Sequence, residues 1–245
     1  MSQDRPRRRY LLAPFAVLLA VVLIHGVYWV VASGQIRSQA LAWIADQEAA
    51  GYAIAHEGLR VGGYPFRFSL RVERPDIAAP DSEGGWRVRA ERLAATAQIY
   101  DLNHWILTPD GDVLLHALTE AGPARWIAAY DAARLSLAGT GGVTTRIGAS
   151  VAGLTLQAES GPEPALEAVG ALNLTGFTTE DDRLTVRVQA DALRLAEGVL
   201  DPALQAAFGR EPQLWRMEAN LTRFDALARA GDPAEWRRAG GVLDI

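Results

Sequence analysis

The sequence contains no cysteine, and this absence excludes three kinds of chemistry. No disulfide can form, no thiolate can bind a metal, and no cysteine nucleophile is available. Lysine is also absent, so all 24 basic residues are arginine, which is typical of a GC-rich genome. The net charge of -5 is small and the charges are scattered, so we expect no basic face and no binding of nucleic acid.

Histidine is scarce as well, with four in the chain. His25 lies in an apolar run, which leaves His56, His104 and His116 for a soluble site, and none has the spacing of a metal ligand pair. No Gly-x-Ser-x-Gly nucleophile motif occurs either. We therefore expect no catalytic site, no metal and no cofactor.

A long uncharged stretch near the start of the chain runs from Leu11 to Val31. Its length of about 21 residues is enough to cross a hydrocarbon core of roughly 30 Å as a helix. Four arginines between positions 5 and 9 precede it, and only Arg37 follows it closely. This bias predicts a single-pass anchor in the inner (cytoplasmic) membrane, with a cytoplasmic N-terminus and a periplasmic main domain. A signal peptide cleaved near Ala32 is the alternative, although its apolar region would usually be shorter.

A second helix is predicted from Gln35 to Ala50, ended by Gly51. Its apolar positions fall on one stripe: Ile36, Ala40, Trp43 and Ile44. This stripe needs a partner, and the sheet that follows is favoured over the membrane surface.

After Gly51 the apolar residues alternate with period two. Strands are predicted at Tyr52–Val61, Phe66–Val72, Trp86–Tyr100, Asp112–Leu118, Ala133–Leu137, Thr145–Ala158, Leu166–Leu174, Leu184–Leu195 and Leu214–Leu221. Clusters of Gly, Pro, Asp and Ser separate them: RPDIAAPDSEGG, TPDGD, AGTGG, ESGPEP and TTEDD. Strands of ten or more residues favour a long curved antiparallel sheet over a compact sandwich.

A few short helices interrupt this pattern. ARWIAAYDA around Trp126 is one candidate, and DPALQAAFG has an N-cap at Asp201 and a stop at Gly209. RFDALARAG and DPAEWRRAG predict further helical turns. The final GGVLDI either leads into a continuing domain or pairs back into the sheet.

The predicted fold is therefore mainly β, with a transmembrane helix and an amphipathic helix ahead of the sheet. The predicted division is a cytoplasmic basic tail (1–10), a transmembrane anchor (11–32), an amphipathic helix (33–51) and an extracytoplasmic β-rich domain (52–245) that can continue beyond residue 245 in a longer protein.

The segment GYPFRFSLRVE shows the alternation most clearly. Its apolar side chains lie on one side: Phe66, Phe68, Leu70 and Val72. If helices cover that side, these residues are ordinary core. The predicted helices are too few to cover nine strands, so the alternative is an open apolar trough that binds an acyl chain or another protein's strand.

Two short motifs carry a resemblance. Gly63-Tyr64-Pro65-Phe66 opens the alternating strand, and Tyr100-x-x-x-His104 follows it. With the arginine-rich start, the single membrane helix and the Trp-bearing helix, they make the chain similar to domain-of-unknown-function family 2125 of Gram-negative envelopes. The abrupt end is typical of a truncated member. A looser similarity in layout links it to AsmA-like proteins. The family implies no known activity.

Three functions stay open from the sequence. A non-catalytic envelope scaffold or lipid-contacting module is favoured, and a periplasmic protein-binding module is the first alternative. An envelope hydrolase is the second, and it would have to gather His104 or His116 with carboxylates.

Overall fold

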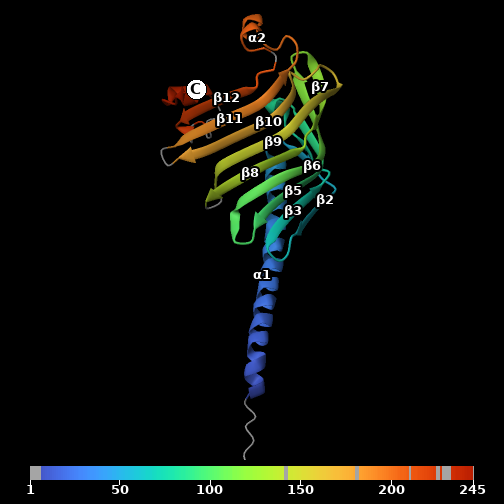
Figure 1. Ribbon diagram of the computed structural model, residues 1–245, viewed down its shortest axis with the longest axis vertical. Coiled ribbons are helices and arrows are strands. Elements are labelled where there is room, and N and C mark those ends of the chain that lie inside the picture. Colours follow the sequence, from blue (N-terminus) through green and yellow to red (C-terminus); the bar gives the residue numbers. More distant parts are fainter. Residues whose placement is uncertain are drawn as a thin grey trace, which may run out of the picture.

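The computed structural model describes residues 7–140, 143–179, 182–209, 211–224, 227 and 233–244. One long helix protrudes from a large antiparallel sheet of 13 strands, as Figure 1 shows. The described helices are α1 (Arg7–Ala49), α2 (Pro202–Phe208) and α4 (Pro233–Arg238), with a 3-10 turn η1 (Asp81–Glu83). The predicted mainly β fold is confirmed.

The strands follow one another along the chain with short connections. They are β1 (Ala53–Ala55), β2 (Gly58–Gly62), β3 (Arg67–Glu73), β4 (Asp76–Ala78), β5 (Arg87–Gln98), β6 (Asp101–Thr119), β7 (Gly122–Ala129), β8 (Ala132–Thr140), β9 (Val143–Ser160), β10 (Leu166–Thr179), β11 (Arg183–Leu195), β12 (Leu214–Thr222) and β13 (Leu243–Asp244).

The two helices predicted from the sequence are one continuous helix, α1. Gly34 lies between the two predicted segments, and a single glycine costs a helix only about 1 kcal/mol, which does not break it. The predicted end at Gly51 is confirmed, because Gly51 has φ +100 and Tyr52 N–H donates to the Gln47 carbonyl at 3.1 Å. This is a Schellman cap.

Three pairs of short strands lie end to end and together behave as single interrupted strands. β1 and β2 pair with β4 and β3, which both pair with β5. In the same way, β7 and β8 both lie between β6 and β9. With each pair counted as one strand, the sheet is an antiparallel meander of ten strands rather than 13.

The interruptions share one level of the sheet, which we call the break line. It passes through His56–Glu57, Arg74–Pro75, Gly111, Tyr130–Asp131 and Gly153. Gly111 and Gly153 have φ values of +73 and +61, and Ala192 continues the line in β11 with φ +50. Residues in this region of φ disturb the regular alternation of a strand. The apolar positions of β9 accordingly change from odd numbers before Gly153 to even numbers after it.

Two local predictions are wrong. TPDGD is a bulge inside β6 rather than a tight turn, because Gly111 and Asp112 are both placed between the registers Arg92↔Asp110 and Ala90↔Val113. ARWIAAYDA is largely strand β7 rather than a helix. Its alanines favour a helix locally, but pairing with β6 and β9 decides its conformation, and Ala124 and Ala128 are buried as alternate residues of a strand.

The remaining helical predictions are mostly confirmed. The Asp201 carboxylate accepts a hydrogen bond from Ala203 N–H at 2.8 Å at the start of α2, and α4 corresponds to DPAEWRRAG. RFDALARAG lies mostly outside the described residues, as do the last two residues of AGTGG and the third and fourth residues of TTEDD. Leu243 and Asp244 of β13 pair with β12, so the end of this chain returns to the sheet.

Candidate functional site

One face of the sheet is apolar across eight strands. Side chains of directly paired residues lie on the same face, so the registers define three rows. The first row is Phe68, Ala97, Trp105, Leu137, Ile147, Gly176, Val186 and Ala219. The second is Leu70, Ala95, Leu107, Leu135, Ala149, Leu174, Val188 and Met217. The third begins with Val72, Leu93 and Pro109 and ends with Val151, Leu172, Ala190 and Trp215. We call these rows the apolar face.

The opposite face of the same strands is polar. The row next to the first one is Ser69, Thr96, Ile106, Ser136, Gly148, Thr175, Arg187 and Glu218, in which Ile106 is the one large apolar residue. The Arg187 guanidinium binds the Glu218 carboxylate at 2.7 Å across β11 and β12, which lowers the pKa of Glu218. The contrast predicted for GYPFRFSLRVE therefore extends far beyond its own strand.

Helix α1 packs against β1, β2 and β3, beside the β3 end of the apolar face. The Trp29 ring stacks on the Phe68 ring with centroids 5.7 Å apart, and Phe68 is 0% exposed. Its cross-strand neighbour Ala97 is 2% exposed. Farther from α1, most side chains of the apolar face are half-buried. Ile147 and Trp215 are exposed, whereas Ala190 and Ala219 are buried.

A groove of about 500 Å³ runs between α1 and the apolar face. The helix lines it with Ile36, Gln39, Ala40 and Trp43. The sheet side contributes mainly apolar residues: Leu70, Ala95, Leu102, Trp105, Leu107 and Leu137. Only Gln39 and Asn103 bring polar side chains, so the groove suits an aliphatic ligand.

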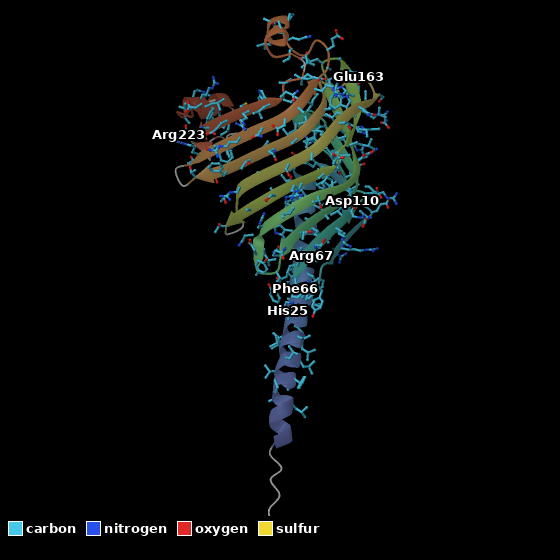
Figure 2. The ribbon with its side chains drawn as sticks, viewed as in Figure 1. His25, Phe66, Arg67, Asp110, Glu163 and Arg223 are labelled. Atoms are coloured by element: carbon cyan, nitrogen blue, oxygen red, sulfur yellow. The ribbon has the colours of Figure 1, made fainter. Side chains whose placement is uncertain are left out.

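The first family motif forms the loop that joins β2 to β3 and contacts α1. The Pro65 carbonyl lies 2.8 Å from His25 Nε2, and Trp29 Nε1–H donates to the Arg67 carbonyl at 3.2 Å. The Tyr64 ring lies against the His25 and Trp29 rings. Figure 2 shows His25, Phe66 and Arg67 together at the end of the sheet where the lone part of α1 emerges.

Gly63 has a clear reason to be glycine. Its φ is +102, and a Cβ there would lie 2.7 Å from the Arg67 carbonyl oxygen. The loop also carries a cis Tyr64–Pro65 bond. Phe66 lies just before β3 and is 74% exposed, unlike Phe68.

The second family motif begins at the neighbouring turn. Ile99 N–H donates to the Phe66 carbonyl at 3.2 Å, which links this turn to the first motif. Tyr100 is 83% exposed, and His104 Nε2 lies 2.8 Å from Ser136 Oγ on β8.

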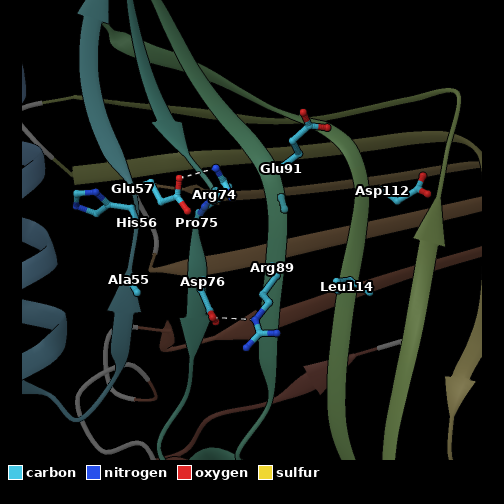
Figure 3. A pocket seen from close by; sticks show the side chains of 11 residues that line it. Ala55, His56, Glu57, Arg74, Pro75, Asp76, Arg89, Glu91, Asp112 and Leu114 are labelled. Carbon is cyan, nitrogen blue, oxygen red and sulfur yellow. Dashed lines mark hydrogen bonds and ion pairs between the residues drawn. The ribbon is translucent and has the colours of Figure 1, made fainter.

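Several charged side chains lie near the break line. A cavity of about 610 Å³ has Glu57, Arg74, Asp76, Arg89 and Glu91 among its lining residues, which Figure 3 draws. Glu57 is paired with Arg74 at 2.8 Å, and Asp76 with Arg89 at 2.8 Å. The Asp76 carboxylate also accepts from Arg87 at 2.5 and 2.6 Å, and these bonds hold the pKa of Asp76 below its usual value.

The three histidines outside the apolar run, His56, His104 and His116, do not lie together in the structure. His104 and His116 lie at opposite ends of β6, and the His56 ring turns toward α1, away from the pairs drawn in Figure 3. His116 lines a separate cavity of about 360 Å³ with Asp81 and Arg125, and burial is the main cause that lowers its pKa. Within the described ranges, no group of three His, Asp or Glu side chains could hold a metal.

The alternation predicts that Phe66, Phe68, Leu70 and Val72 share one face. Phe68, Leu70 and Val72 lie on the apolar face. Phe66 lies before β3, is 74% exposed and is not part of these rows. It missed the groove, because Trp43 and Trp105 come from segments far apart in the chain. It also missed the contact of the first motif with His25. The signal available for that contact was the aromatic cluster Tyr28, Trp29, Tyr64 and Phe66.

These features define a class of protein with one apolar N-terminal helix that is long enough to cross a membrane and one bent sheet with an apolar face. The chain matches, over residues 29–245, the model of the family described as an uncharacterized protein conserved in bacteria, DUF2125. It therefore belongs to that family. No curated protein and no solved structure matches it, and the looser similarity to AsmA-like proteins is not shown.

Proposed function

We propose that this chain is a membrane-anchored, non-catalytic module of the bacterial envelope that holds a lipid acyl chain in the groove between α1 and the apolar face. The proposal places the anchor in the inner membrane and the sheet in the periplasm. The observation that carries it is the apolar groove beside a helix able to cross the membrane.

The chemistry of the groove favours an aliphatic ligand. Its volume of about 500 Å³ lies within the usual range for small-molecule sites. A polar ligand would find few partners there, because the side chains from β3, β5 and β8 that line it are apolar. An acyl chain would gain about 0.8 kcal/mol for each methylene removed from water.

Position favours a lipid from the same membrane. Ile36, the first groove residue of α1, follows the predicted membrane exit at Val31 by five residues, or about 7.5 Å of helix. The helix that crosses the bilayer is therefore also a wall of the groove. A lipid leaving that leaflet would have an apolar surface within reach of its tail.

The polar groups support a role without catalysis. Glu57, Asp76 and Glu218 are each paired with an arginine. A general acid or base needs a free group with a tuned pKa beside its substrate, and the arginines instead favour charged carboxylates.

Native mass spectrometry of the gently extracted full chain tests the proposal. We expect bound lipid in the wild type and its loss in Leu107→Asp, which puts a charge on the apolar face inside the groove. Thr108→Asp is the matched control, because Thr108 is the next residue of β6, exposed on the opposite face. Equal lipid content in the two variants, or none in the wild type, would contradict lipid binding in this groove.

A further inference from the structure

Two neighbouring loops at one end of the sheet expose aromatic side chains beside α1. The loop Gly63–Phe66 and the turn Ile99–Tyr100 are joined by a backbone hydrogen bond of 3.2 Å from Ile99 to Phe66. Tyr64 is 51% exposed, Phe66 74% and Tyr100 83%. We define these three side chains as the aromatic tip.

The length of α1 locates this tip relative to a bilayer. The uncharged residues from Leu11 to Ile24, just before His25, span only about 21 Å at 1.5 Å per residue. A hydrocarbon core is about 30 Å thick, and Arg7, Arg8 and Arg9 limit how far α1 can slide through it. A bilayer thinned by about 9 Å would cost fractions of a kcal/mol per ångström.

The contacts of the first motif with α1 therefore lie at membrane depth. If the span continues to Val31, His25 lies about 9 Å below the exit of the helix and Trp29 about 3 Å below it. The Pro65 carbonyl is next to His25, and the Arg67 carbonyl is next to Trp29. The loop between them cannot stay in bulk water while α1 spans the core.

We propose that the aromatic tip is a second membrane contact, with Tyr64, Phe66 and Tyr100 seated in the interfacial layer of the leaflet on the side of the sheet. Tyrosine suits this layer, because its ring is apolar and its hydroxyl meets water or headgroups. The wholly apolar Phe66 ring gains by leaving water beside it. The tip would fix the sheet against the bilayer, with the groove opening directly above it. This inference depends on the anchor in the proposed function and not on lipid binding in the groove.

The absence of cysteine makes the test direct, because one introduced cysteine takes one environment-sensitive fluorophore. The variants are Phe66→Cys and Tyr100→Cys in the full chain, reconstituted in phosphatidylcholine–phosphatidylglycerol vesicles. Both side chains are exposed, so the substitutions leave the packing unchanged. Leu19→Cys in the middle of the membrane helix is the positive control. Glu163→Cys, at the far end of the sheet in Figure 2, is the negative control.

Spin-labelled lipids then serve as quenchers, with the label at the headgroup or in mid-chain. We expect both tip probes to lose most of their fluorescence to the headgroup label, the Leu19 probe to the mid-chain label, and the Glu163 probe to neither. If only Leu19 is quenched, the tip proposal is wrong while the anchor holds. Failure to quench Leu19 would overturn the anchor and the tip together. Lipid binding in the groove is tested separately, by the mass spectrometry described above, and does not depend on the outcome of the quenching experiment.

Discussion

The two ends of the apolar face have the same pattern and different surroundings. At the α1 end, Phe68 is 0% exposed because Trp29 stacks on it. At the β12 end, Trp215 occupies the same face and is 42% exposed. The alternation of apolar and polar residues along the strands decides which face is apolar. The position at which the single helix α1 packs decides which part of that face is buried.

The β12 end is covered less completely than the α1 end, since Ala190 and Ala219 are buried there but Trp215 stays exposed. Large contiguous apolar surfaces on soluble domains mark places where lipids or other proteins bind. The groove lies at the boundary between the two ends, where α1 approaches Leu107 and Leu137 without closing on them. The covered end thus provides stability, and the boundary provides the proposed binding site.

Removing one large side chain from each end gives the largest expected contrast. Phe68→Ala should lower the free energy of unfolding by about 3–5 kcal/mol, because it leaves a cavity beneath Trp29. Trp215→Ala should cost less, about 1–2 kcal/mol, because that residue is 42% exposed. Urea unfolding of both variants in the same detergent measures the difference.

Equal losses in these two variants would show that the β12 end is also covered in the intact protein. A second copy or a partner strand would then be its occupant. The protein-binding alternative is therefore tested by the same experiment.

Gly63→Ala tests how firmly the covered end is held by its loop. The new Cβ would lie 2.7 Å from the Arg67 carbonyl oxygen at φ +102, so we expect a loss of about 1–3 kcal/mol. Gly62→Ala is the matched control, since nothing lies within 4 Å of its Cβ and its φ is ordinary. Thermal melts that rank the two variants equally would mean that the loop does not support the contact with α1.

The sequence predicted which residues form the apolar face, but it did not predict which part of that face α1 covers. Period-two alternation in Phe68, Leu70 and Val72 is a local property, and it recurs in each long strand. Contacts such as Trp29 with Phe68 join distant segments, so no local pattern indicates them. The apolar face was therefore visible in the sequence, while the groove and the motif's contact with His25 were not.

The break line escaped prediction for a different reason. Gly111 and Gly153 punctuate a sequence in the same way whether they form a hairpin or a bulge, because both need positive φ. Only the register shows that β6 continues through TPDGD. Sequence periodicity alone therefore divided one strand into a turn and a shorter strand.

The smallest contrast concerns two ion pairs, one at each end of the sheet. Asp76 on β4 has a pKa lowered chiefly by its hydrogen bonds from Arg87, and Glu218 on β12 has a pKa lowered by its bond from Arg187. A carboxyl whose pKa is lower when folded stabilises the protein above its unfolded pKa, near 4. That stability is lost as the pH falls through the folded value. The Asp76 side chain is 20% exposed and that of Glu218 is 49%, so water and salt screen the second pair more.

Asp76→Asn should accordingly lower the free energy of unfolding at pH 7 by about 1 kcal/mol and flatten its decline between pH 5 and pH 3. Glu218→Gln should change the pH profile less, and its effect should vanish in high salt. Urea midpoints at several pH values, with and without added salt, measure both. A larger change for Glu218→Gln would mean that its pair is shielded from water, and so that something covers the polar face of the sheet at β12.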